Sequence, residues 1–106
     1  MSEITIFVRH DAELDALGYF EYIYDHNPEA ALRFLSGIDQ TIQRLAKQPL
    51  KGRLRKFRGK DLKNVRSWRV DDFENYLIFY RLSEGILEIL RIKHGAMRFP
   101  ESLRRN

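Results

Sequence analysis

The residues best suited to chemistry in this chain are arginines and aromatic side chains that alternate in the stretch LKNVRSWRVDDFENYLIFYR, residues 62–81. Arginine donates paired hydrogen bonds to carboxylates and phosphates, and tryptophan and tyrosine supply the contact area that anchors interfaces. These residue types predict the binding of a large partner. The candidate binding residues in the second half of the chain are Arg66, Trp68, Arg69, Tyr80, Arg81, Arg91 and Lys93.

A second candidate surface is a basic segment in the middle of the chain. Residues 51–69 hold nine lysines and arginines and one aspartate, a net charge of +8, although the whole chain carries only +4. Clustered positive charge attracts polyanions and acidic proteins. A solvated loop is the alternative, but Leu54 and Phe57 lie between the cations and indicate an ordered segment. The predicted basic patch consists of Lys51, Arg53, Arg55, Lys56, Arg58, Lys60 and Lys63.

Composition argues against several classes of site. The chain has no cysteine, which excludes disulfides and thiolate metal sites. His10, His26 and His94 lack the spacing of zinc ligands, and Gly52 and Gly59 do not form a phosphate-binding loop. Because the sequence also lacks a signal-peptide core and a long apolar run, we expect a cytoplasmic protein without metal, cofactor or membrane partner.

The candidate residues must be positioned by the elements around them, which begin with a strand and two helices. Residues 4–9 alternate branched and aromatic side chains, a pattern that predicts a strand. Asp11 is the expected cap of a first helix. The core-facing stripe predicted for this helix is Ala16, Leu17, Phe20, Ile23 and Tyr24. Asn27 as N-cap and Pro28 as first residue predict a second, antiparallel helix that ends before Pro49.

Three further strands are predicted in the second half, over residues 65–70, 74–82 and 85–94, joined by tight turns. The order of strand, two helices and three strands predicts a two-layer α+β fold. In this fold, an antiparallel helical hairpin covers a three-stranded antiparallel meander with the N-terminal strand beside it. A chain of 106 residues has room for one such domain, so we expect residues 1–106 to form it.

The predicted strands are apolar on both faces. Side chains alternate along a strand, so Arg66 and Trp68 fall on one face of their strand and Arg69 on the other, while Tyr80 and Arg81 lie on opposite faces of the next. The helical hairpin can cover only one face of the sheet. The sequence therefore predicts that the other face, with its aromatic and arginine side chains, is exposed to a partner.

Three segments, taken together, resemble a known family. They are NPEAALRFLSGIDQTIQRLAKQP, VRSWRVDDFENYLIFYRL and GILEILRIKHGAMR, which span residues 27–49, 65–82 and 85–98. In this order they resemble the ParE branch of the ParE/RelE toxin superfamily, the toxins of bacterial type II toxin–antitoxin pairs. The resemblance implies a small cytosolic toxin that a cognate antitoxin neutralises. ParE-like members are described as inhibitors of DNA gyrase, whereas RelE-like members cut messenger RNA on the ribosome.

The ribonuclease alternative makes a chemical demand that can be checked against the sequence. Cleavage of RNA through its own 2′-hydroxyl requires proton transfer and cations that stabilise the developing phosphorane charge. Arg69, Arg81 and Arg91 could supply charge, and His94 could act as acid or base. The next residues, 95–97, are glycine, alanine and methionine, none of which transfers a proton. The sequence therefore favours inhibition by binding over cleavage.

The expected partners follow from this preference. They are a cognate antitoxin with an acidic toxin-binding region and DNA gyrase, with the ribosome and its message as the alternative target. A third alternative is a general RNA-binding module, in which the basic patch would grip phosphates while Phe57 or Trp68 stacks on bases. The tail after residue 97 is basic as well.

Overall fold

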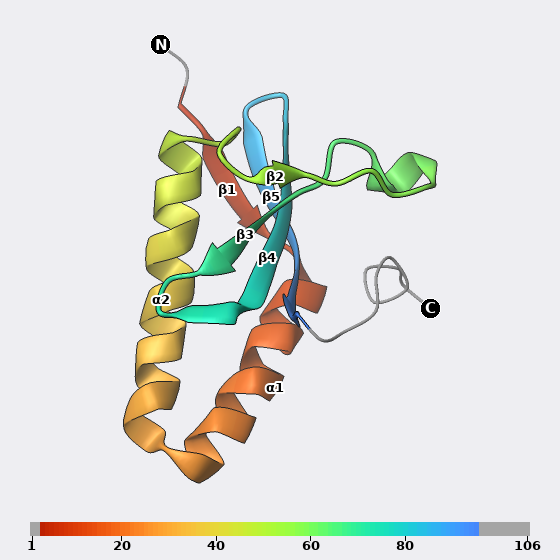
Figure 1. Ribbon diagram of the computed structural model, residues 1–106. Coiled ribbons are helices and arrows are strands. Elements are labelled where there is room, and N and C mark those ends of the chain that lie inside the picture. Colours follow the sequence, from red (N-terminus) through yellow and green to blue (C-terminus); the bar gives the residue numbers. More distant parts are fainter. Residues whose placement is uncertain (1–2, 96–106) are drawn as a thin grey trace.

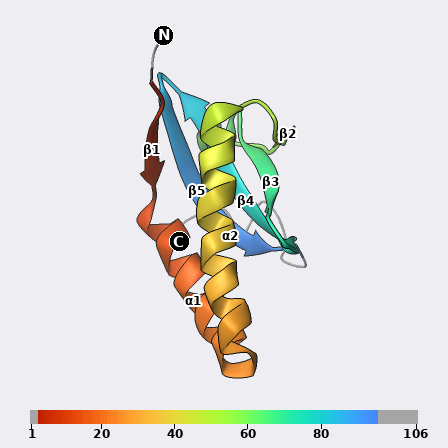
Figure 2. The ribbon, with the colours of Figure 1, turned by 90° about the vertical axis from the view of Figure 1, so that its left-hand side faces the viewer.

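The computed structural model describes residues 3–95 and has two layers, a pair of helices on one face of a mixed sheet (Figure 1). In chain order the elements are β1 (Thr5–Val8), α1 (His10–His26), α2 (Pro28–Lys47), β2 (Arg53–Leu54), the 3-10 helix η1 (Lys60–Leu62), β3 (Arg66–Val70), β4 (Phe73–Ser83) and β5 (Ile86–His94). Figure 2 shows α1 and α2 in front of the sheet, whose strand order is β1-β5-β4-β3-β2. The predicted α+β fold class is confirmed.

Most of the sheet is an antiparallel meander, because short turns join its consecutive strands. Asp72, Glu84 and Gly85 all have positive φ angles, and the pair Glu84–Gly85 forms the two-residue connection between β4 and β5. β1 instead pairs with β5 in parallel, with Thr5 opposite Ile86. The N-terminal strand therefore lies at one edge of the sheet, beside β5.

A single residue, Asn27, separates the two helices. Its side chain accepts a hydrogen bond from the backbone N–H of Ala30 at 3.1 Å, and Pro28 occupies the first helical turn. Both features satisfy the N-terminus of α2, as predicted. The two helices consequently pack against each other as a hairpin.

The predicted cap of α1 is wrong. The helix begins at His10, after Arg9 in extended conformation, and no side chain caps it. Asp11 lies inside the first turn, where its negative charge faces the positive end of the helix dipole. An acidic residue is favourable at either position, which explains why the sequence alone placed the boundary two residues late.

The side of α1 that faces the core also differs from the predicted one. Leu17 and Tyr24, predicted as core residues, are 51% and 48% exposed. Apolar residues surround most of this helix, so the helical period fits more than one face. The small side chains at positions 12 and 16 allow close packing and decide the orientation. The residues that α1 contributes to the core are Ala12, Ala16, Tyr19 and Ile23.

The middle of α2 fixes the turn between β3 and β4. Thr41 Oγ1 donates a hydrogen bond to the carbonyl of Gly37 at 2.6 Å and accepts one from the N–H of Asp71 at 3.0 Å. Arg44 forms an ion pair with the Asp71 carboxylate. A Cβ atom at Gly37 would lie 2.7 Å from the Asp71 carbonyl, so this close approach of helix and turn requires glycine.

The main core lies between the helices and the sheet. Along α2, side chains three or four residues apart are buried, as an amphipathic helix requires. They contact side chains from the inner face of β3, β4 and β5. The fully or nearly fully buried members of this core include Phe34, Ile38, Ile42, Leu45, Val70, Ile78, Tyr80, Leu87, Ile89 and Ile92.

The opposite face of the sheet, which we expected to be exposed, is partly covered by the chain itself. Leu62 is buried and Phe57 is partly buried against Val65, Phe79 and Leu90. The prediction of a bare, apolar and cationic face is therefore wrong. The sequence predicted an ordered basic segment, with a solvated loop as the alternative. In the structure Phe57 and Leu62 of this segment reach the sheet, while most of its cations stay exposed.

Candidate functional site

The aromatic residues predicted to anchor a partner face the helices. Tyr80 is fully buried in the main core, and Trp68 is partly buried against it. Burial of the whole Tyr80 side chain excludes it from an exposed contact surface in this conformation. Arg66 lies on the same face and its Nη1 donates hydrogen bonds to the carbonyls of Leu50 and Gly52, at 3.2 and 2.9 Å. Arg66 and Tyr80 therefore fix the backbone that follows α2 against the sheet.

The Tyr80 hydroxyl binds the backbone that follows α2. It accepts a hydrogen bond from the N–H of Gly52 at 2.9 Å and donates one to the carbonyl of Pro49 at 2.8 Å. Burial raises the pKa of Tyr80, an effect that the Gly52 N–H and the Arg66 charge oppose. Any Cβ atom at Gly52 would overlap this hydroxyl, so the position requires glycine.

Trp68 is flanked by two cations. Lys51 Nζ and Arg69 Cζ each lie 4.7 Å from the centre of its ring, within the range of a cation–π interaction. Arg69 is exposed, and it forms no ion pair with any residue of the part of the chain that the structure describes. Of the predicted binding residues on β3 and β4, Arg69 is the one whose charge is most accessible to a partner.

The cations of β5 are held by a carboxylate from α1. Asp15 accepts hydrogen bonds from Arg91 Nε and Nη2 at 2.8 and 3.0 Å, from Lys93 Nζ at 3.4 Å and from the N–H of Ile92 at 3.0 Å. The hydrogen bonds that Arg91 donates to Asp15 raise the pKa of Arg91, against the effect of burial. Because β1 pairs with β5 only as far as Ile89, the carboxylate also occupies the edge of the strand beyond that point.

Arg81 likewise forms its hydrogen bonds within the molecule. Its Nε donates to Glu88 Oε1 at 3.1 Å across the β4–β5 pair, and its Nη1 donates to the carbonyl of Asp61 at 2.9 Å. His94 lies opposite Tyr76, and Tyr76 is five residues before Arg81 on β4. At roughly 3.3 Å per residue, His94 and Arg81 are therefore about 16 Å apart along the sheet. Arg81 is therefore not brought together with His94.

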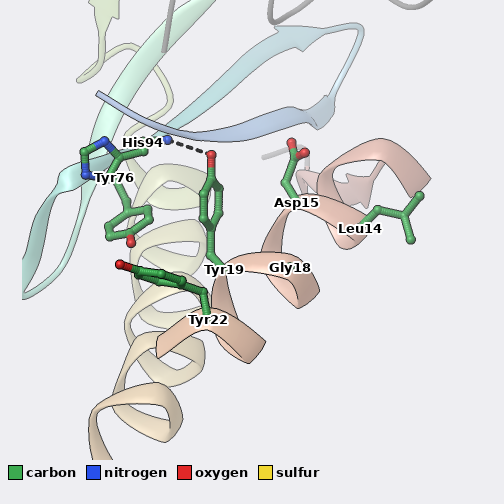
Figure 3. A pocket seen from close by; sticks show the side chains of 7 residues that line it. All are labelled: Leu14, Asp15, Gly18, Tyr19, Tyr22, Tyr76 and His94. Atoms are coloured by element: carbon green, nitrogen blue, oxygen red, sulfur yellow. Dashed lines mark hydrogen bonds between the residues drawn. The ribbon is translucent and has the colours of Figure 1, made fainter. Parts of the chain in front are cut away.

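His94 lines a pocket of about 580 Å³ between α1 and the ends of β4 and β5 (Figure 3). Its backbone N–H donates to the Tyr19 hydroxyl at 3.0 Å, and its ring meets that of Tyr76 edge-on, with 5.0 Å between centres. Burial, together with Tyr19 and Tyr22, raises the pKa of Tyr76. The residues that line the pocket are Leu14, Asp15, Gly18, Tyr19, Tyr22, Tyr76 and His94.

The sequence did not predict this pocket, although it held a signal. Leu14, Gly18 and Tyr22 recur every four residues and thus follow one side of α1, away from the side that enters the core. A Cβ atom at Gly18 would meet nothing within 4 Å, so this glycine leaves open space in the pocket wall.

The absence of proton donors predicted after His94 involves residues 96 and 97, which lie outside the described part of the chain.

The predicted basic patch forms a defined surface, here called the basic arm, comprising residues 51–63. The arm projects from the sheet on the side away from α2 (Figure 1). Arg55 turns inward, where its Nε donates to Ser67 Oγ at 2.8 Å and its guanidinium lies 5.8 Å from the Phe79 ring. Burial, and then the charge of Arg53, lowers the pKa of Arg55. The exposed cations of the arm are Lys51, Arg53, Lys56, Arg58, Lys60 and Lys63.

Two classes of site find no support among residues 3–95. No group of three or more histidine, cysteine or acidic side chains is placed to hold a metal ion in this range. Neither helix of the described chain has the length and apolar character that crossing a bilayer requires.

The fold matches that of a bacterial toxin–antitoxin structure. The chain is similar to a solved structure described as the chromosomal ParDE TA system from P. aeruginosa, with a TM-score of 0.70 and 18% sequence identity, covering 86% of this chain and 95% of that chain. At this identity the similarity shows a shared fold. No curated protein matches the chain.

The sequence itself establishes the family. The family model described as the ParE toxin of the type II toxin–antitoxin system parDE matches residues 6–99. This chain belongs to the ParE toxin family, as its resemblance to the ParE branch indicated.

Proposed function

We propose that this ParE toxin acts by binding and inhibiting DNA gyrase in the cytoplasm, and that a cognate antitoxin neutralises it. Membership of the ParE family supports the proposal. The main supporting observation is that the cations that RNA cleavage would require are ion-paired with acidic side chains of the same chain. Arg91 and Lys93 bind the Asp15 carboxylate, and Arg81 binds Glu88.

Ion pairing makes these side chains poor catalysts of phosphoryl transfer. A cation that stabilises a phosphorane must meet the developing negative charge, and a carboxylate at 2.8 Å already neutralises Arg91. The distance between Arg81 and His94 along the sheet adds to this argument, because one RNA phosphate cannot contact both. Inhibition by binding makes no such demand on geometry.

Arg69 is our candidate for contact with gyrase. It is exposed on β3, and its guanidinium and the Lys51 ammonium each lie 4.7 Å from the centre of the Trp68 ring, so the site offers a partly accessible aromatic side chain with two cations. Arginine and tryptophan are common energetic anchors of protein interfaces. A charge reversal at Arg69 should therefore weaken inhibition.

The helical hairpin is our candidate surface for the antitoxin. Large apolar side chains remain exposed on both helices, and α1 also borders the aromatic pocket beside His94. Exposed apolar surface of this extent is typical of a binding site for another protein. The side chains concerned are Leu14, Leu17, Tyr22 and Tyr24 on α1 and Leu32 and Leu35 on α2.

Two assays with purified protein test the proposed target. We expect the toxin to block supercoiling by gyrase and to leave ribosome-bound message intact. Arg69→Glu should lower the inhibition of supercoiling at least about tenfold, a loss typical of an interface anchor. Arg33→Glu, the same charge reversal on the exposed side of α2, should have little effect. Cleavage of message that His94→Ala abolishes would instead establish the ribonuclease alternative.

A further inference from the structure

The basic arm is held in one conformation by contacts along its whole length. At its base, Tyr80 and Arg66 bind the backbone around Gly52. In its middle, the N–H of Arg55 donates to the carbonyl of Val65 at 2.8 Å. A loop whose only role was to keep the protein soluble would not require these hydrogen bonds.

The tip of the arm is fixed as well. Arg81 donates to the carbonyl of Asp61, and the next residue, Leu62, is buried under the sheet. Gly59 and Asn64, on either side of η1, have φ angles of 109° and 60°, which turn the chain into and out of this helix. The arm therefore presents its exposed cations from a fixed backbone.

Four of these cations carry a charge that is not balanced within the described chain. Arg53, Lys56, Lys60 and Lys63 are exposed and form no ion pair with any acidic side chain of residues 3–95. Asp61 is the only acidic residue between residues 51 and 63. Like charges held close together repel one another, so a partner with regularly spaced negative charge would relieve the repulsion.

The apolar side chains of the arm are mostly committed to the fold. Leu62 is buried and Phe57 packs on Phe79, with 6.3 Å between ring centres. Leu54, 44% exposed, lies in the short strand at the base. The outer part of the arm thus offers neither an aromatic anchor for a protein interface nor a ring on which an unpaired base could stack.

We propose that the basic arm binds the sugar–phosphate backbone of duplex DNA. A double helix carries one negative charge per ~1.7 Å of its axis and keeps its bases stacked inside, so cations alone suffice for contact. This match of charge without exposed rings favours a duplex over single-stranded RNA or an acidic protein. Such binding needs no gyrase, although gyrase would bring the same kind of duplex close to the toxin.

Fluorescence anisotropy with a labelled 20-base-pair DNA duplex tests the proposal. We expect the purified toxin to bind in 50 mM salt, with an affinity that falls steeply as salt rises. Lys56→Glu and Lys60→Glu, tested separately, should each lower the affinity about tenfold and reduce the salt slope by about one, the loss of one phosphate contact. Arg33→Glu makes the same change in net charge on α2 and should change the affinity less than about twofold.

The competing ligands decide the class of partner. Single-stranded RNA, duplex RNA and poly-L-glutamate, measured in the same buffer, should all bind more weakly than duplex DNA. Tighter binding of any of them, an equal loss in Arg33→Glu, or no binding of the duplex in 50 mM salt would overturn the proposal. Because gyrase is absent from this assay, its outcome is independent of the supercoiling test.

Discussion

The hydroxyl of Tyr80 connects the centre of the sheet to the backbone that begins the basic arm. It bonds to Gly52 and Pro49, each roughly thirty residues earlier in the sequence, and the Tyr80 side chain is buried in the core. One phenol therefore satisfies one buried and one partly buried backbone group and sets the direction in which the arm leaves α2. Replacement of this single oxygen affects the fold and the position of the arm together.

Tyr80→Phe should lower the free energy of unfolding by about 1–3 kcal/mol at pH 7, because the Gly52 N–H and the Pro49 carbonyl lose their partner. Urea denaturation measures this loss. Tyr24→Phe is the matched control, since Tyr24 is 48% exposed and its ring contact with Phe20 does not require the hydroxyl. A loss of equal size in both variants would refute the role given to Tyr80.

The same variant should show how stability depends on alkaline pH. Burial raises the pKa of Tyr80 in the folded protein above the value of about 10 that a tyrosine has in the unfolded chain. Its contribution is therefore complete below pH 10 and is lost as the pH rises from there toward the folded pKa. Between pH 9 and 11, wild type should lose more stability than Tyr80→Phe. Parallel pH profiles of the two proteins would contradict this expectation.

At the scale of elements, α1 closes the edge of β5 that β1 leaves open. β1 covers β5 as far as Ile89, and beyond it Asp15 and Tyr19 accept hydrogen bonds from the N–H groups of Ile92 and His94. A helix thereby replaces the missing strand with side-chain acceptors. The arrangement protects an edge that could otherwise pair with another chain.

Asp15→Asn should weaken this closure. The asparagine cannot neutralise Arg91 and Lys93, whose side chains are only 16% and 10% exposed, so the variant should lose about 2–4 kcal/mol of stability. Hydrogen exchange at the Ile92 amide should accelerate in parallel. Asp25→Asn removes an exposed carboxylate from the same helix and should change neither quantity. Unchanged exchange at Ile92 in Asp15→Asn would show that the carboxylate does not hold the edge.

Local patterns predicted the elements better than the contacts between them. The Asn27–Pro28 boundary and the strands of the meander follow from capping and alternation, which act within a few residues. The partner of β1 and the cover over the second sheet face depend on long-range packing. Two apolar residues among many cations, Phe57 and Leu62, were too weak a pattern to predict that this segment covers the second face of the sheet.

The candidate site was predicted in part, for the same reason. Charge patterning located the basic arm, because cations mostly stay exposed wherever a loop lies, as all of those in the arm except Arg55 do. The roles of Arg81, Arg91 and Lys93 could not be read from sequence, since their partners Glu88 and Asp15 come from other elements. Tyr80 was assigned to the wrong face because nothing local shows which side of a doubly apolar strand the helices cover. The binding role of Arg69 stays a prediction.

At the scale of the whole molecule, charge and apolar surface are separated. The arm carries the positive charge on one side of the sheet, while the helical hairpin exposes its apolar side chains on the other. Charge acts over a distance and speeds encounter, whereas apolar contact holds a complex once it has formed. One protein can therefore use the two surfaces at different stages of binding.

This separation predicts the kinetics of antitoxin binding. Between 50 and 500 mM salt, the association rate of an acidic antitoxin should fall at least about tenfold by screening, while the dissociation rate changes little. Surface-immobilised toxin and stepped salt concentrations measure both rates. Leu17→Ser should instead speed dissociation and leave association almost unchanged, because Leu17 is exposed on α1 and uncharged. Salt-independent association would show that charge does not steer this partner.

The pairing of the first strand with the last has a consequence for how each molecule is made. Thr5 lies opposite Ile86, so β1 has no neighbour until about 80 further residues have been added, which takes roughly 4–16 s at 5–20 residues per second. The hairpin, in contrast, is complete by Lys47. Each newly synthesised chain therefore contains the full sequence of both helices several seconds before its sheet can be completed, and a partner that binds the hairpin, as proposed above for the antitoxin, would have this interval in which to bind.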